Sequence, residues 1–120
     1  MQISNVLAGV AVSDLPRARR WYESLFGRGV DAEPMAGLVE WHTPGGVVQL
    51  VSDPERAGGS LVTLQVPDAR QALTELAERD GPTVDLDDTT SDKVLFARVT
   101  DPDGNAITVV QVREGVRLSP

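Results

Sequence analysis

Apolar residues along the chain form short runs and two segments with helical spacing. The run from Leu7 to Val12 is apolar and partly β-branched, which predicts a strand. From Leu15 to Phe26, apolar side chains recur every three or four residues and predict a helix with one buried face. Ser13-Asp14 precedes this segment as an N-cap, Pro16 lies in its first turn, and Gly27 follows as a C-cap.

Three extended runs are predicted after this helix. They lie around Gly29-Val30, over Gly37 to Thr43 and over Val47 to Val51. The turn Pro44-Gly45-Gly46 joins the last two, and a polar, glycine-bearing connection from Ser52 to Ser60 follows. The first half of the chain is therefore predicted to run strand, helix and three strands.

The same order of elements then begins again. Leu61 to Val66 predicts a strand, Pro67-Asp68 a second cap, and Ala69 to Arg79 a second helix that ends at Gly81-Pro82. Further extended runs and a hairpin turn complete this half (Thr83 to Leu86, Val94 to Val99, Ala106 to Val112, and the turn Asp101-Pro102-Asp103-Gly104-Asn105).

The two halves can be superimposed as sequences. Five positions of the first half match residues at one constant offset in the second: Leu7, Val10, Val12, Asp14 and Ala18 match Leu61, Leu64, Val66, Asp68 and Ala72. Pro44 and Gly46 likewise match Pro102 and Gly104. We therefore predict an α+β fold in one domain, built from two tandem βαβββ modules. Module 1 spans about 1–54, module 2 about 60–112, and residues 113–120 form a C-terminal tail.

Composition narrows the classes of function. The 120 residues are 41% hydrophobic and include no cysteine, which suits one core without disulfides or thiolate sites. No apolar run is long enough to span a membrane and the first residues do not form a secretion signal, so a cytoplasmic location is predicted. The net charge of −7 disfavours nucleic acid as a partner. It either steers a cationic ligand or only keeps the protein soluble.

Two segments and one turn carry a family resemblance. Residues 12–18 (VSDLPRA) and 21–27 (WYESLFG) resemble the opening of the vicinal oxygen chelate proteins. This superfamily includes glyoxalase I, bleomycin-resistance proteins, fosfomycin-resistance enzymes and extradiol dioxygenases. The turn at residues 101–105 is similar to the turn before its last strand. The resemblance spans about Val6 to Val112 and implies that two modules form a cup around a ligand.

Enzymes of this superfamily hold a divalent metal in the cup through His, Gln or Glu on the first and last strands of each module. The resemblance places these four positions at Leu7, Gln49, Leu61 and Thr108. Two leucines offer no donor, and a threonine hydroxyl and one amide are a poor set for zinc or iron. His42, the only histidine, has no obvious orienting acid nearby in sequence. We therefore predict no metal site, no cofactor and no catalytic residue.

Alternation of side chains along each strand predicts which residues face the cup. Trp41 or Glu40 faces inward, depending on whether the first turn shifts the register by one residue. Trp41 either stacks on a ligand or fills the core. An inward Arg98 needs an anion, which is Glu40 or a ligand carboxylate or phosphate, unless it reaches solvent at the rim. The predicted ligand-binding residues are Trp41, Gln49, Thr63, Gln65, Phe96, Arg98 and Thr108.

The leading hypothesis is a small-molecule-binding homodimer. Bleomycin-resistance proteins, which the chain resembles, enclose an antibiotic in an acidic cleft between two chains, and this implies a cationic or aromatic ligand. One alternative is a glyoxalase-like lyase, an isomerase or a dioxygenase with an atypical site at Arg98, Gln49 and Glu40. Another is an interaction module whose cup is filled by its own side chains (Leu7, Leu61 and Phe96).

Overall fold

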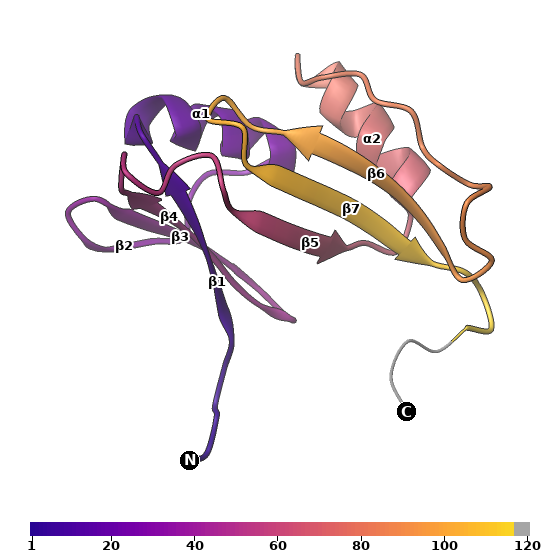
Figure 1. Cartoon of the computed structure of the whole chain (residues 1–120), viewed down its shortest axis with the longest axis horizontal. Coiled ribbons are helices and arrows are strands. Elements are labelled where there is room, and N and C mark those ends of the chain that lie inside the picture. Colours follow the sequence, from indigo (N-terminus) through magenta and orange to yellow (C-terminus); the bar gives the residue numbers. More distant parts are fainter. Residues whose placement is uncertain (117–120) are drawn as a thin grey trace.

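The computed structural model describes residues 1–116 (Figure 1). The first half contains β1 (Leu7–Val12), α1 (Leu15–Phe26), β2 (Ala32–Met35), β3 (Leu38–Thr43) and β4 (Gly46–Ser52). The second half contains β5 (Leu61–Gln65), α2 (Ala69–Glu78), β6 (Val94–Thr100) and β7 (Ala106–Val112). The mixed α+β fold predicted from the sequence is therefore confirmed.

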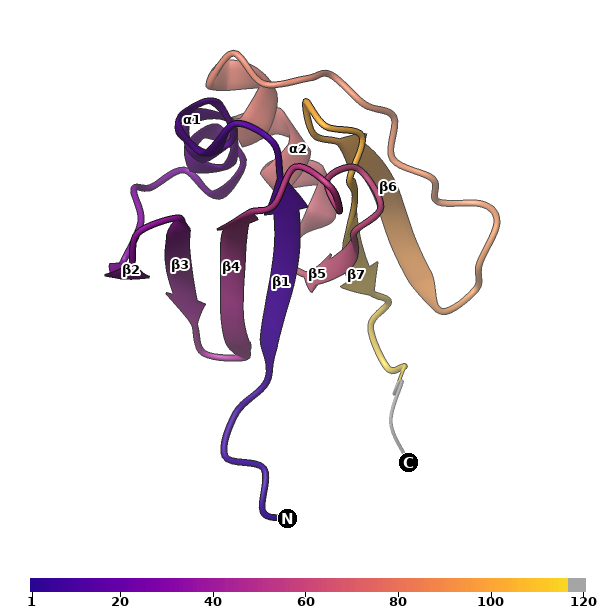
Figure 2. The ribbon, with the colours of Figure 1, turned by 60° about the vertical axis from the view of Figure 1, so that its left-hand side comes forward.

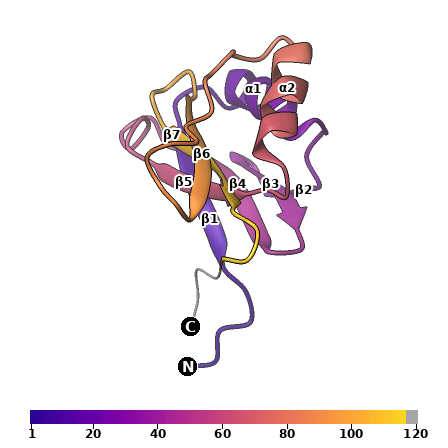
Figure 3. The ribbon, with the colours of Figure 1, turned by 90° about the vertical axis from the view of Figure 1, so that its right-hand side faces the viewer.

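The strands form two separate sheets. The first has the order β1-β4-β3-β2 and the second β5-β7-β6. In each sheet the strand before the helix pairs in parallel with the last strand of its module, as β1 does with β4 and β5 with β7. Figure 2 shows α1 and α2 on the same side of the molecule, with the two sheets diverging beneath them. Figure 3 shows the two helices next to each other at one end of the molecule.

The main core lies between α1 and the first sheet. Val10 and Val12 of β1 and Leu50 of β4 are fully buried there, together with Tyr22 of α1. Trp41 of β3 is 1% exposed, and its ring centroid lies 5.0 Å from that of Phe26 and 6.2 Å from that of Tyr22. Aromatic rings at such separations contribute packing energy beyond the area they bury.

Both predicted helices form, and their ends follow from the sequence. The Asp14 side chain accepts a hydrogen bond from Arg17 N, and the Asp68 side chain accepts one from Gln71 N. Gly27 ends α1 in the left-handed region, with φ of 73°. A residue with a Cβ is disfavoured there, which explains the glycine.

Two of the predicted strands are wrong. Gly29-Val30 is not a strand, because β2 begins only at Ala32, after Arg28 and Asp31 have paired side chain to side chain. Thr83 to Leu86 is not a strand either, and the only pairing in this region is one bridge from Asp87 to Phe96. The second module therefore runs βαββ where the sequence predicted βαβββ.

The segment before β6 turns directly after its one bridged residue, Asp87. The Asp87 carboxylate accepts hydrogen bonds from the backbone N–H groups of Thr89 and Thr90 and from the Thr90 hydroxyl. A side chain that satisfies its own following backbone forms a turn and competes with strand pairing. These hydrogen bonds also lower the pKa of Asp87 below its ordinary value, chiefly through Thr90.

The turn between β6 and β7 links the two halves of the molecule. Asn105 is fully buried, and its Oδ1 accepts hydrogen bonds from Gly58 N at 3.0 Å and Ser60 N at 2.8 Å. Its Nδ2 donates to Ala11 O and to Asp101 Oδ2, each at 2.8 Å. One side chain therefore joins β1, the connection between the modules and the last hairpin.

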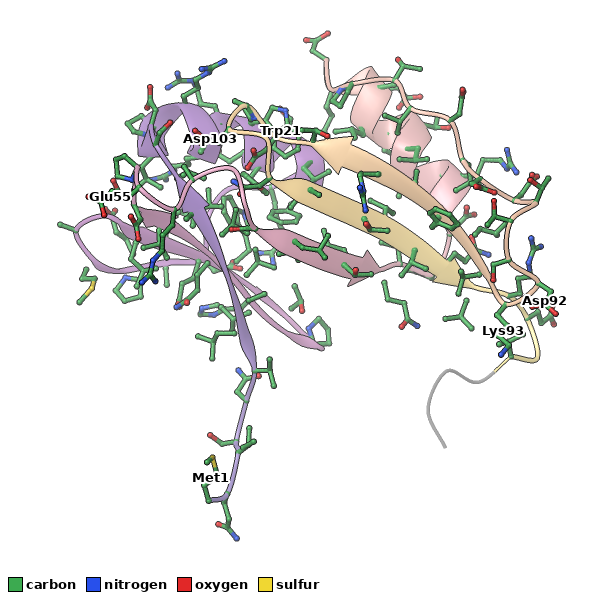
Figure 4. The ribbon with its side chains drawn as sticks, in the orientation of Figure 1. Met1, Trp21, Glu55, Asp92, Lys93 and Asp103 are labelled. Atoms are coloured by element: carbon green, nitrogen blue, oxygen red, sulfur yellow. The ribbon has the colours of Figure 1, made fainter. Side chains whose placement is uncertain are left out.

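Tyr22 and Asp103 extend this link to α1. The Tyr22 hydroxyl donates to Asp101 Oδ2 at 2.7 Å inside the protein. Burial, and then the bond to Asp101, raise the pKa of Tyr22 well above its usual range, so the hydroxyl stays protonated as the donor. Asp103, which lies beside the start of α1 in Figure 4, accepts from the backbone and hydroxyl of Ser13.

The ends of the described chain lie apart from this core. Met1 lies at the far end of an extended segment that runs away from the sheets (Figure 4). The predicted C-terminal tail, 113–120, falls partly outside the described residues, which end at 116. Among residues 1–116, no helix is long and apolar enough to cross a membrane.

The Asn105 side chain gives a test of the link between the modules. We expect Asn105→Ala to lower the free energy of unfolding by about 3 kcal/mol, because it leaves several buried donors and acceptors without partners. Urea denaturation followed by circular dichroism measures this loss. The exposed Asn5→Ala serves as the control, with a change within about 0.5 kcal/mol. Equal stability of the two variants would contradict a structural role for Asn105.

Candidate functional site

Each sheet packs one face against the helices and leaves its other face uncovered within the chain. We call these uncovered faces the bare faces. On the first sheet, alternation and burial place nine side chains or glycines on the bare face: Leu7, Gly9, Ala11, Leu38, Glu40, His42, Val47, Gln49 and Val51. On the second sheet they place eleven: Leu61, Thr63, Gln65, Val94, Phe96, Arg98, Thr100, Ala106, Thr108, Val110 and Val112.

Strand register aligns the polar residues of each bare face in one row. In the first sheet Gly9 pairs with Gln49, which pairs with Glu40. In the second sheet Thr63 pairs with Thr108, which pairs with Arg98. These rows occupy equivalent places in the two modules, so the repeat sets an acid and a base at matching positions.

The row of the first sheet ends in a hydrogen-bonded carboxylate. Gln49 Nε2 donates to Glu40 Oε2 at 2.6 Å, and His42 Nε2 lies 3.0 Å from Glu40 Oε1. The Glu40 side chain is 11% exposed and that of His42 is 51% exposed. The bond from His42, followed by that from Gln49, lowers the pKa of Glu40 below its ordinary value. The carboxylate is thus held in its ionised form.

The pairing of His42 with Glu40 was missed in the sequence. The expectation that His42 has no acid near it is wrong, because Glu40 lies two positions earlier on the same strand. Residues i and i+2 of a strand project from the same face. The signal was therefore present in the spacing Glu-x-His within a predicted strand.

Trp41 does not belong to this site. The prediction that it contacts a ligand is wrong in this structure, because the side chain packs against α1 on the opposite face of the sheet. Its Nε1 donates to Arg28 O at 3.1 Å. The register therefore resolves the choice between Trp41 and Glu40, and Glu40 is the residue on the bare face.

Arg98 is exposed at the end of the second row. The ion pair between Arg98 and Glu40, one of the alternatives left open by the sequence, does not form within the chain, and the Glu40 oxygens contact His42 and Gln49 instead. Within residues 1–116, the Arg98 guanidinium has neither an ion-pair nor a hydrogen-bond partner. The structure therefore places one cation without such a partner on the edge strand β6 of the second bare face.

The four positions that the family resemblance assigns to metal ligands carry few oxygen or nitrogen donors. Leu7 and Leu61 project hydrocarbon from the bare faces and are 47% and 69% exposed. Gln49 already donates its amide to Glu40, and Thr108 offers only a neutral hydroxyl. In the described part of the chain, no three His, Cys, Asp or Glu side chains gather as metal ligands do. This donor set does not fit the metal chemistry of the superfamily.

Two cavities lie beside α2. One, of about 210 Å³, lies between the helices and the second sheet and includes Phe26, Leu73 and Leu76 in its lining. Arg79 at its rim donates to the carbonyls of Ser24 and Leu25, the last turn of α1. This cavity is therefore a packing gap closed by a helix cap. The bare faces need a second wall to become a cleft.

The class of fold is defined by two similar modules. In each module a helix connects two parallel strands, and one face of the sheet stays open. Residues 3–109 match the model of the Glyoxalase/Bleomycin resistance protein/Dioxygenase superfamily. The chain belongs to this superfamily. No curated protein matches the chain.

Solved structures agree with this assignment. A glyoxalase / bleomycin resistance protein from Catenulispora acidiphila DSM 44928 is 33% identical, with a TM-score of 0.82 over 91% of this chain and 98% of that one. An antibiotic binding protein from Streptomyces sp. CB03234 is 28% identical, with a TM-score of 0.72 over 94% and 99% of the two chains. A bleomycin-binding protein solved with bleomycin is 16% identical, with a TM-score of 0.67 over 92% and 100%, and shares the fold.

The lowered pKa of Glu40 predicts a pH dependence. A carboxyl whose folded pKa is depressed stabilises the fold above its ordinary pKa of 4.5, and this stabilisation disappears as the pH falls through the lower folded value. We therefore expect the stability gap between the natural chain and Glu40→Gln to be largest near neutral pH. The gap should narrow below pH 4.5.

Urea denaturation of both proteins across this range measures the gap, and carbon NMR of the Glu40 carboxyl measures its pKa directly. Glu33→Gln is the control, because Glu33 is exposed and makes no ion pair among the described residues. A gap that stays constant with pH would contradict an ionised, hydrogen-bonded Glu40.

Proposed function

We propose that the protein binds a small molecule between the bare face of a first sheet and the bare face of a second sheet, without a resident metal or cofactor. The observation that carries this proposal is the pair of polar rows, each set in an otherwise largely apolar open face. A few polar groups among apolar ones are typical of small-molecule sites. The residues in the place of the metal ligands favour binding over metal-assisted catalysis.

Similarity to binding proteins supports the same reading. The 28% identical structure is described as an antibiotic binding protein, and the match covers almost all of both chains. The predicted contact residues Gln49, Thr63, Gln65, Phe96 and Thr108 lie on the bare faces, as a ligand between the sheets would require. Their contact with a ligand is part of this proposal.

We propose further that the protein is a homodimer whose second copy closes the cleft. Each bare face is open in the single chain, and a large apolar side chain is exposed on each: Leu7 at 47% and Leu61 at 69%. The first sheet of one copy facing the second sheet of the other would bring acid toward base. Like faces would instead bring two Glu40 or two Arg98 side chains together, which costs free energy.

Gly9 offers a direct test of the site. A Cβ at Gly9 meets nothing within 4 Å, so the strand itself tolerates a side chain there. We expect Gly9→Phe to fold as the natural chain does but to fill the bare face beside Gln49. Binding of small molecules identified by thermal shift and calorimetry should fall at least about tenfold, or about 1.4 kcal/mol.

The matched control is Arg17→Phe, which adds the same ring to an exposed position on α1. It should leave affinity and the dimeric mass in sedimentation unchanged. Equal affinity of the Gly9→Phe variant and the natural chain would exclude the bare face as the site. A monomeric natural chain at the concentrations that bind ligand would contradict the cleft between two copies.

A second candidate function is proton-transfer catalysis, which the 3.0 Å contact between His42 and Glu40 favours. A carboxylate that orients an imidazole is a common arrangement for a general base. Binding alone predicts that bound molecules are recovered unchanged by mass spectrometry and NMR. An isomerised or cleaved product with the natural chain, lost in His42→Asn, would show an enzyme, and stoichiometric zinc, nickel, manganese or iron on elemental analysis would point to metal chemistry.

A further inference from the structure

Arg98 stands out on the bare face of the second sheet. Among the residues that β5, β6 and β7 place on this face, it is the one charged side chain. The chain has 18 acidic residues, yet none of them is on this face of the three strands. A protein of net charge −7 therefore keeps this face of the three strands free of carboxylates, and the acid bridged to the outer edge of β6, Asp87, already accepts hydrogen bonds from Thr89 and Thr90.

We infer that Arg98, Thr108 and Thr63 form a recognition site for the carboxylate of the bound molecule. This inference rests on the proposed binding function and names its ligand class. Directly paired residues on neighbouring strands have Cβ atoms about 5 Å apart. The register places the Thr108 hydroxyl next to Arg98 and that of Thr63 one strand further, so two donors follow the guanidinium along one row.

The chemistry of the row selects a carboxylate over other ligand groups. A guanidinium presents a planar fork of N–H donors that matches the two oxygens of a carboxylate. Threonine hydroxyls add neutral hydrogen bonds to the same oxygens. A cationic group would meet no counter-charge on this face of β5, β6 and β7.

The neighbouring rows determine what the carboxylate is attached to. Phe96 and Val110 pair in the row next to Arg98, and Ala106 pairs in the row on its other side. Rows on one face of a strand are about 7 Å apart, which is close to the width of one six-membered ring. The site therefore suits an aromatic or short aliphatic carboxylic acid, with its apolar body over Phe96.

Glu40 is the competing partner for Arg98. In the proposed dimer, Glu40 of a second copy faces the same cleft. Within the chain, however, both Glu40 oxygens already accept hydrogen bonds at 2.6 and 3.0 Å. A carboxylate that is already bonded gains less from a second partner than a free ligand anion does.

Calorimetry with the full chain tests the inference, with benzoate and phenylacetate each compared with its own amide. We expect the acids to bind at least about tenfold more tightly than the amides, and the difference to shrink at high salt. Arg98→Met should remove this preference, and Arg98→Lys should restore only part of it, because an ammonium lacks the fork. Arg20→Met is the matched control, since Arg20 is exposed on α1 and outside the bare faces, and it should change nothing.

Three outcomes would overturn the inference. The first is equal binding of acid and amide, and the second is unchanged acid binding by the Arg98→Met variant. The third is a loss of dimer stability in both Arg98→Met and Glu40→Gln, with no further loss when the two substitutions are combined. That result would assign Arg98 to an ion pair between copies. If molecules without a carboxylate bind and Gly9→Phe weakens their binding, while carboxylates do not bind, the binding function stands and this ligand class is wrong. If no molecule binds at all, the proposed function fails as well.

Discussion

The buried side chain of Asn105 is the contact on which the arrangement of the molecule depends. It bonds to β1, to the connection between the modules and to the turn of the last hairpin, while Asp101 of the same turn receives the Tyr22 hydroxyl. Each module could form its own strand pairs alone, but their relative placement needs a shared element. Directional hydrogen bonds in a buried site fix that placement more precisely than apolar contact, because each donor requires its acceptor at a defined distance.

This placement explains why the two sheets diverge while their helices remain on one side. The helices cover the apolar faces that hold Val10, Leu50 and Trp41. Once those faces are covered, the chain contains no third layer for the opposite faces. An α+β domain with one layer of helices leaves open sheet surface, and in this protein that surface carries the polar rows that end in Glu40 and Arg98. The open surface is thus a direct result of how the core is built.

Much of this fold was predictable from local chemistry. Asp14 and Gly27 mark the ends of α1, and the turn from Asp101 to Asn105 forms where its residue types indicate. The strand predicted at Thr83 to Leu86 did not form, because this segment pairs with β6 at Asp87 alone and then turns, with the Asp87 carboxylate accepting from the backbone of Thr89 and Thr90. Hydropathy patterns do not register such a turn. The sequence did not decide which face of the sheet Trp41 occupies, because the shorter first turn could shift the strand register by one residue. The pairing of β3 with β4 fixes that register. Strand parity predicted that Thr63, Arg98 and Thr108 share one face, whereas the His42–Glu40 pair was overlooked, and the role of these residues in a site stays a prediction.

The bridge between Asp87 and Phe96 has a consequence for how the two halves can diverge. In the first sheet, β2 pairs with β3 at two positions with a register shift between them, and so is tied to its neighbour at both ends. The second sheet has only one bridged position at the corresponding edge, and a self-bonded turn occupies the space. Residues can be added or lost on either side of that bridge without moving any strand out of register. The segment from 80 to 93 is therefore where this duplicated chain can change length, and acquire new surface, while the sheets beneath it stay the same.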